Sequence, residues 1–117
     1  MDIIQDGVEH MNINDLVHKY YLSNDFNVLA DKTKHDYQYC AGVLLATEVD
    51  GKSLSEIRLT KMTGAIARRG YEQWLGRGIY QANAITSVAR KVYSYGMEMG
   101  YAESNPFATY KRKPTHV

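Results

Sequence analysis

The sequence predicts an all-α bundle of four main helices and no sheet. Apolar residues recur at helical spacing in four separate segments, near residues 13–23, 32–47, 60–76 and 80–99. The chain's two prolines stand at positions 106 and 114, so residues 1–105 contain no proline to break a helix. No segment alternates apolar and polar residues over the length of a strand. Together these observations indicate one helical domain.

The first two helices are defined by their apolar faces and by their first residues. In the first, the apolar face includes Leu16, and either Asn12 or Asn14 provides a cap. In the second, Asp31 is the expected N-cap, and the core-facing positions follow the spacing i, i+3, i+4, i+7, i+8. These positions are Tyr37, Cys40, Ala41, Leu44 and Leu45. We expect Cys40 to be a buried free thiol.

A turn and two further helices follow. Asp50-Gly51 is a common hairpin dipeptide, but its flanks do not alternate, so we expect a turn without strands. Thr60 is the expected N-cap of the third helix. The fourth helix is the most regular, and Gly100 stands where a left-handed C-terminal cap belongs. Its buried stripe consists of Ile85, Val88, Ala89, Val92, Gly96 and Met99.

The formal net charge of +1 results from two halves of opposite sign. Residues 1–50 contain 3 Lys/Arg and 9 Asp/Glu, a net charge of −6, whereas residues 51–117 contain 11 and 4, a net charge of +7. Such a polarised chain can present a basic face to a polyanion, or its two halves can neutralise each other across the fold. Both interpretations remain open on charge alone.

The polar face of the fourth helix is the main candidate for a binding surface. At 100° per residue, the side opposite the buried stripe carries small hydroxyl and amide groups beside an arginine, which suit a phosphate backbone or a base edge. These residues are Asn83, Thr86, Ser87, Arg90 and Ser94, with Lys91 at the edge. The alternative is a solvated face that is rich in Ser and Thr.

Three further groups of residues are candidate contacts with an anion. Lys32, Thr33 and Lys34 open the second helix, where backbone N–H groups attract negative charge. Arg68 and Arg69 are adjacent on the third helix and point about 100° apart, so at most one of them faces a given ligand. Lys111, Arg112 and Lys113 form a basic strip that we expect to be flexible.

Enzyme chemistry has no positive support in the sequence. The four histidines and Cys40 have no metal-ligand spacing, and no phosphate-binding glycine loop or serine elbow is present. We therefore predict no catalytic residues, metal or cofactor. The N-terminus lacks a signal peptide, and no apolar run approaches the roughly 18 residues of a membrane span. A cytoplasmic protein without membrane contact is the corresponding expectation.

The order of several motifs resembles the core-binding domain of phage integrases and other tyrosine recombinases. Thr33 and Tyr37 match a family pattern in the second helix, and Leu54–Ile57 match a Leu-x-x-Ile element. The family's last helix typically starts with Thr-x-Asn and is followed by Gly-x-ϕ-x-x-Asn-Pro. The matching residues here are Asn83, Ile85, Val88, Val92, Gly100, Asn105 and Pro106, whereas Gln81 and Ala84 depart from the pattern.

The resemblance implies a SAM-like orthogonal bundle of four or five helices that binds double-stranded DNA. It divides the chain into a leader (1–12), a helical core-binding domain (13–105) and a basic linker (106–117) toward a catalytic domain. It also implies that the second and fourth helices face the major groove of the DNA. The protein would then act in the bacterial cytoplasm, together with other recombinase protomers. The DNA-contact residues expected from all these arguments are Lys32, Thr33, Lys34, Arg68, Asn83, Ser87, Arg90, Lys91, Lys111 and Arg112.

A helical protein–protein interaction module is the alternative class. Its adhesive surface would include the segment YYLSNDF and the aromatic residues of the fourth helix. A protein-binding surface should carry large apolar anchors around Arg90, and the sequence places none there. DNA binding is therefore the function that the sequence favours.

Overall fold

A computed structural model describes residues 8–115 and shows a mostly helical protein. The α-helices are α2 (Ile13–Tyr21), α3 (Asn24–Asn27), α4 (Asp31–Ala46), α5 (Gly64–Trp74) and α6 (Ile79–Glu98). Short 3-10 turns are η1 (Leu54–Glu56), η2 (Leu59–Lys61), η3 (Leu75–Arg77) and η4 (Pro106–Ala108). Over residues 8–115, no helix combines the length and apolar character that a membrane crossing requires. The all-α prediction is confirmed.

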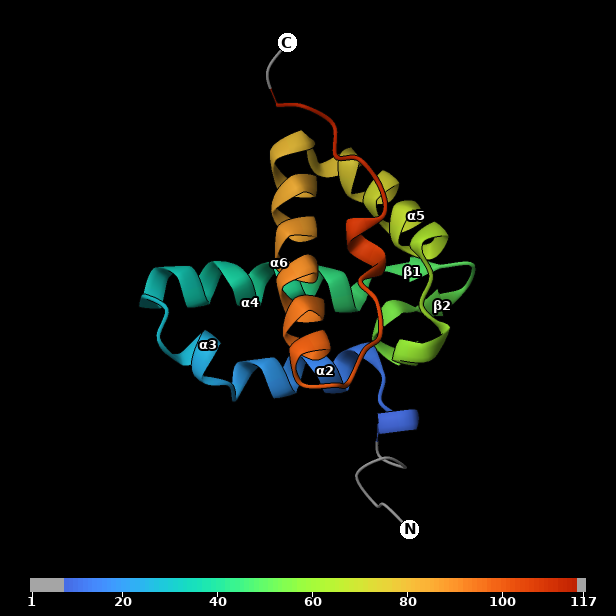
Figure 1. Ribbon diagram of the computed structural model, residues 1–117. Coiled ribbons are helices and arrows are strands. Elements are labelled where there is room, and N and C mark those ends of the chain that lie inside the picture. The colour runs from blue at the N-terminus through green and yellow to red at the C-terminus, as the bar shows by residue number, and fades with distance from the viewer. Residues whose placement is uncertain (1–7, 116–117) are drawn as a thin grey trace.

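The long helix α6 organises the fold. Figure 1 shows α6 standing across α2 and α4, which lie behind it at a steep angle, while α5 leans against its first half. After α6 the chain turns back and runs beside this helix in the opposite direction. Gly100 makes the reversal possible with φ of +78°, and the Tyr101 amide donates to the Gly96 carbonyl at 2.7 Å. The predicted glycine cap is confirmed.

One continuous core joins all of these elements. Tyr20 of α2, Leu44 of α4, Trp74 of α5 and Tyr93 of α6 are each at least 98% buried. Phe107, which follows the Asn-Pro turn, is completely buried among them and stacks on the Trp74 ring at 6.3 Å between centroids. Pro106, Phe107 and Tyr110 are thus buried in the fold, although the sequence assigned residues 106–117 to a linker.

The predicted helix starts are correct at the first helix and wrong at the next two. Asn12 caps α2 in a capping box with Asp15. Ala30, and not Asp31, is the N-cap of α4, so Asp31 is its first helical residue. Thr63, and not Thr60, caps α5, and its hydroxyl accepts from the Ile66 amide at 3.2 Å. The residues before Thr63 form η2, which buries Leu59.

The expectation of no sheet is wrong in one small place. Strands β1 (Glu48–Val49) and β2 (Lys52–Ser53) pair antiparallel around Asp50 and Gly51. Both turn residues have positive φ, 54° and 81°, which matches the type I′ turn that this dipeptide favours. Strands of two residues are too short to show alternation, so the pattern in the sequence missed them. Asp50 also pairs with Arg69.

Candidate nucleic-acid interface

The chain's own C-terminal segment, residues 105–113, covers the polar face of α6. Asn105 Nδ2 donates to the Arg90 carbonyl at 3.0 Å at one end of the contact. At the other end, Asn83 Nδ2 donates to the Lys113 carbonyl at 3.0 Å. Much of the face that the sequence left open to a ligand is therefore already occupied by protein, although Ser87 and Ser94 on it stay exposed.

Arg90 fixes the middle of this segment. Its Nε donates to the Phe107 carbonyl at 2.7 Å, and its Nη2 donates to the Tyr110 carbonyl at 3.1 Å. Hydrogen bonds from a charged donor are stronger than those between neutral groups. The expectation that Arg90 is available on an open polar face is wrong, because its guanidinium is engaged with the backbone of the C-terminal segment.

Thr86 and Tyr110 form the buried part of the same contact. Thr86 is completely buried, and its Oγ1 lies 2.9 Å from the Tyr110 hydroxyl. The sequence had placed Thr86 on the exposed face of the helix. This prediction is wrong, because the C-terminal segment covers Thr86. Burial raises the pKa of Tyr110, while the hydrogen bond to Thr86 and the charge of Arg90 act in the opposite direction.

Tyr71 of α5 holds the end of the segment. Its hydroxyl donates to Asn83 Oδ1 and accepts from the Lys113 backbone N–H, each at 2.7 Å. Arg112 returns to α6 and donates from Nη1 to the Ser87 hydroxyl at 2.6 Å. These bonds fix the backbone of the basic strip, which the sequence predicted to be flexible.

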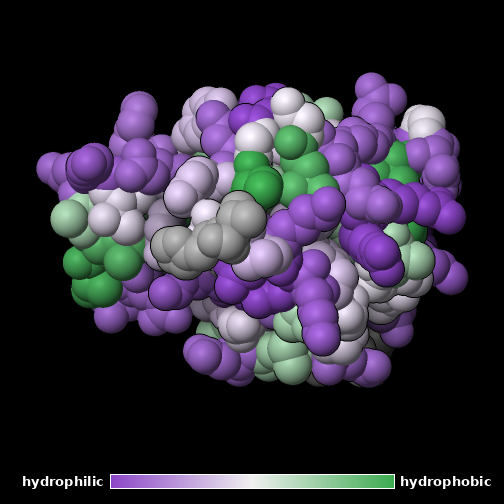
Figure 2. Space-filling view, turned by 90° about the horizontal axis from the view of Figure 1, so that it is seen from above, coloured by the Kyte–Doolittle hydropathy of each residue, from purple (hydrophilic) through white to green (hydrophobic). Residues whose placement is uncertain are grey.

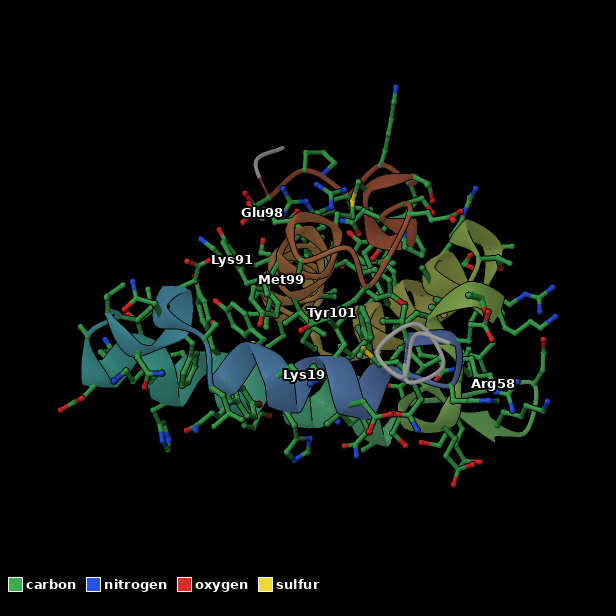
Figure 3. All side chains as sticks on the ribbon, turned by 60° about the horizontal axis from the view of Figure 1, so that its bottom comes forward. Lys19, Arg58, Lys91, Glu98, Met99 and Tyr101 are labelled. Atoms are coloured by element: carbon green, nitrogen blue, oxygen red, sulfur yellow. The ribbon has the colours of Figure 1, made fainter. Side chains whose placement is uncertain are left out.

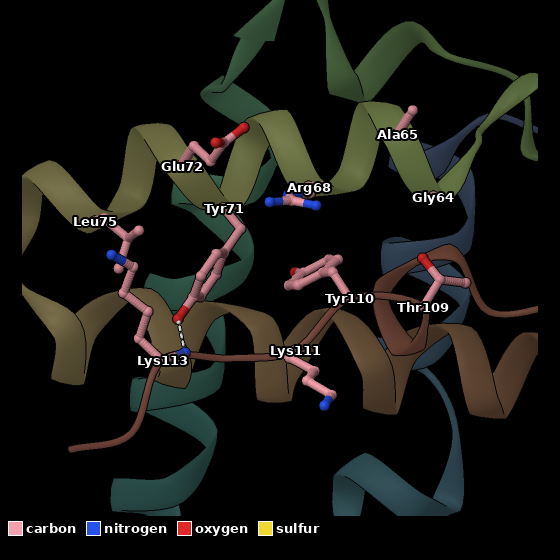
Figure 4. A pocket seen from close by; sticks show the side chains of 10 residues that line it. All are labelled: Gly64, Ala65, Arg68, Tyr71, Glu72, Leu75, Thr109, Tyr110, Lys111 and Lys113. Carbon is pink, nitrogen blue, oxygen red and sulfur yellow. Dashed lines mark hydrogen bonds between the residues drawn. The ribbon is translucent and has the colours of Figure 1, made fainter. Parts of the chain in front are cut away.

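An open groove of about 960 Å³ lies between α5 and this segment. Figure 4 shows Arg68 projecting from α5 toward the segment that carries Tyr110, while Lys111 and Lys113 extend from the segment itself. Glu72 is the single carboxylate among the lining residues. The groove is thus predominantly basic, and its cations stand on two backbones that are fixed relative to each other.

The structure separates the other predicted contacts from this groove. Lys32, Thr33 and Lys34 begin α4, at the end of the molecule where α3 lies in Figure 1, away from α5. Lys34 Nζ lies 6.0 Å from the centroid of the Phe26 ring, a cation–π contact. Lys91 is exposed on the flank of α6, as Figure 3 shows. The basic residues therefore form more than one group.

Three residues that anchor the C-terminal segment were not singled out from the sequence: Tyr71, Asn105 as a hydrogen-bonding group, and Tyr110. A usable signal existed, because Phe107 and Tyr110 are aromatic residues three positions apart in a stretch assigned to a linker. Aromatic side chains in such a stretch indicate docking on a core, since they bury a large apolar area.

No metal site or reactive thiol accompanies the groove. Within residues 8–115, no three His, Cys, Asp or Glu side chains lie together closely enough to hold a metal ion. Cys40 is buried, as expected, and its burial raises the pKa of the thiol, which disfavours the nucleophilic thiolate.

Comparisons with protein-family models, with curated proteins and with solved structures found no match to this chain.

Proposed function

We propose that the chain is the DNA-binding module of a phage-type site-specific tyrosine recombinase. The order of motifs from Thr33 to Pro106 supports this assignment, and so does the mostly helical fold with α6 crossing α4. In this proposal the fold is the SAM-like core-binding bundle of that family. The module grips one side of the recombination site and carries no catalytic residues of its own.

The observation that carries the proposal is the array of three cations around the groove. Arg68 lies on α5, and Lys111 and Lys113 lie on a segment whose backbone is hydrogen-bonded at both ends. Arg112 of the same segment points to α6, where it donates to the Ser87 hydroxyl. A cation on a fixed backbone loses less conformational entropy on binding than one on a free tail. The array therefore suits the regularly spaced phosphates of a duplex.

The expected binding is weak and dependent on salt. Three phosphate contacts predict a log–log salt slope of about −3, and a nonspecific Kd on the order of 10⁻⁴ to 10⁻⁶ M near physiological salt. Phosphate contacts alone carry little sequence information. Sequence readout in the complete recombinase would then depend on further contacts, including those of Lys32, Thr33 and Lys34 if α4 enters the groove of the DNA.

The remaining parts of the proposal follow from the same assignment. The module would act with the catalytic domain of its parent protein and with other recombinase protomers on DNA, in the bacterial cytoplasm in association with the nucleoid. It would need no cofactor.

Fluorescence anisotropy with a labelled 16-base-pair duplex tests the proposal. Replacing Lys111 and Lys113 with alanine should weaken binding and reduce the salt slope by about 2 at most. The matched control replaces Lys52 and Lys61, which are exposed and lie outside the groove. No binding by the unaltered protein at low salt, or equal losses in both double variants, would contradict the proposal.

A protein–protein interaction module remains the second candidate, because one end of the molecule exposes apolar side chains. Leu22 and Val28 flank α3 and are 84% and 70% exposed. Figure 2 shows an apolar area at the end of the molecule that α3 and the start of α4 form. A partner bound there would perturb the amides of Tyr20, Tyr21 and Phe26 and leave the basic groove unchanged.

A further inference from the structure

A second concave site lies where β2, η1, η2 and α5 meet. It is a cleft of about 420 Å³, a volume within the range typical of ligand sites. The lining residues are Lys52, Glu56, Ile57, Arg58, Lys61 and Ile66. None of these residues belongs to the basic groove between α5 and the C-terminal segment.

The chain before α2 fixes one wall of this cleft. The Ile13 amide donates to the Ile57 carbonyl at 3.1 Å, and the Leu59 amide donates to the Met11 carbonyl at 2.9 Å. Asn12 and Arg58 form an antiparallel bridge between the same two stretches. The backbone that carries Ile57 and Arg58 is therefore held on both sides of Arg58, so the cleft is already formed in the free protein.

The cleft combines an apolar centre with a basic rim. Ile57 and Ile66 are both half-buried, so each still presents apolar surface. Lys52, Arg58 and Lys61 are exposed around them. Within residues 8–115, the ion pair between Arg69 and Asp50 is the only one, so these three cations have no carboxylate partner in that part of the chain.

We propose that this cleft binds an acidic peptide segment of a partner protein. One aliphatic side chain of the peptide packs between Ile57 and Ile66, and flanking carboxylates pair with Lys52, Arg58 and Lys61. Such a segment uses both features of the cleft. A nucleic-acid backbone uses only the cations, because its phosphates gain nothing from contact with isoleucine. Glu56 repels carboxylates and phosphates alike, so the apolar contact is what distinguishes the two ligands.

The proposed peptide site is independent of the proposed DNA interface. Figure 3 shows Arg58 at the edge of the molecule far from Lys91, with the C-terminal segment on another side. Each surface can therefore be altered without changing the other. A failure to bind DNA would therefore say nothing about the peptide site, so the DNA interface and the peptide site are each tested with a separate probe.

The probe is a fluorescein-labelled peptide, Asp-Glu-Ile-Ile-Asp-Glu, added to the ¹⁵N-labelled full chain. We expect amide shifts at residues 52, 57, 58, 61 and 66. A peptide with Ser-Ser in place of Ile-Ile, and a peptide with Asn and Gln in place of the acids, should each bind at least about tenfold more weakly. A 16-base-pair duplex should leave these amides unchanged.

Two variants of equal charge change separate the cleft from general attraction to a basic protein. Arg58→Glu with Lys61→Glu should weaken peptide binding at least about tenfold, whereas Lys111→Glu with Arg112→Glu should change it less than about threefold. Circular dichroism of each variant establishes that it is folded. Equal losses in both variants, or larger shifts at the cleft with the duplex than with the peptide, would overturn the proposal.

The sequence of residues 1–7, MDIIQDG, itself contains two isoleucines between two acids. The titration is therefore repeated on a chain that begins at residue 8, which removes a potential competitor. Binding at the cleft in either form of the protein supports the proposal. Absence of binding in both forms refutes it.

Discussion

Replacing Arg90 with alanine distinguishes a residue that holds the protein together from one that contacts DNA. The guanidinium of Arg90 makes two hydrogen bonds, to the Phe107 carbonyl at 2.7 Å and to the Tyr110 carbonyl at 3.1 Å. A hydrogen bond from a charged group contributes about 1.5–3 kcal/mol, and its loss leaves the acceptor without a partner. The two bonds share one side chain, so their contributions do not simply add.

We expect Arg90→Ala to lower the free energy of unfolding by about 2–3 kcal/mol, because Arg90 is half-buried and water can replace part of the contact. For a domain of this size, this corresponds to a fall in Tm of about 8–12 °C. Urea denaturation followed by circular dichroism measures the free energy of unfolding. Lys91→Ala is the matched control, since it removes the same charge from an exposed neighbour and should cost at most about 0.5 kcal/mol.

The opposite pattern would refute the reasoning. If Arg90→Ala leaves the free energy of unfolding within about 0.5 kcal/mol of the unaltered protein while duplex affinity falls by about 1–3 kcal/mol, then Arg90 contacts DNA directly. In that case the C-terminal segment would not be docked on α6 in solution.

Three smaller predictions concern the packing of this segment. Tyr110→Phe removes the hydrogen bond to the buried Thr86 hydroxyl and should cost about 1 kcal/mol by urea denaturation, whereas Tyr93→Phe removes a buried hydroxyl without a partner in the described structure and should be neutral or stabilising. Burial raises the pKa of Tyr93 above its usual value of about 10. The unfolded state therefore loses its proton before the folded state does, and the free energy of unfolding falls as the pH rises above about 10; Tyr93→Phe should flatten that alkaline loss. A Cβ at Gly64 would collide with the Thr109 side chain, so Gly64→Ala should lower Tm. Gly64→Ala with Thr109→Ala removes the closest contact and should recover part of that loss.

The helices could be predicted because their determinants are local. Apolar residues three and four positions apart specify one face of a helix, and this spacing gave α2, α4 and α6 to within two residues at each end. The start of α5 was displaced from Thr60 to Thr63 because both residues are acceptable caps. Only the packing of the preceding η2 turn distinguishes them.

The candidate site was harder to predict from the sequence, because its main contact joins two segments that are distant in the sequence. The helical period correctly grouped Asn83, Ser87 and Arg90 on one face of α6. Whether that face meets water or protein depends on the docking of Phe107 and Tyr110, which no periodicity within α6 reports. For this reason the structure places the candidate DNA-binding cations on the segment that lies over α6, whereas the sequence placed them on α6 itself.

An NMR footprint of a 16-base-pair duplex at low salt tests the central claim most directly. The claim is that DNA binds the basic groove formed by α5 and the docked C-terminal segment. It predicts the largest amide shifts at Arg68 and at residues 111–113, with shifts that diminish as salt is raised. Shifts that gather instead at Tyr20, Tyr21 and Phe26, or a spectrum that the duplex leaves unchanged, would contradict it.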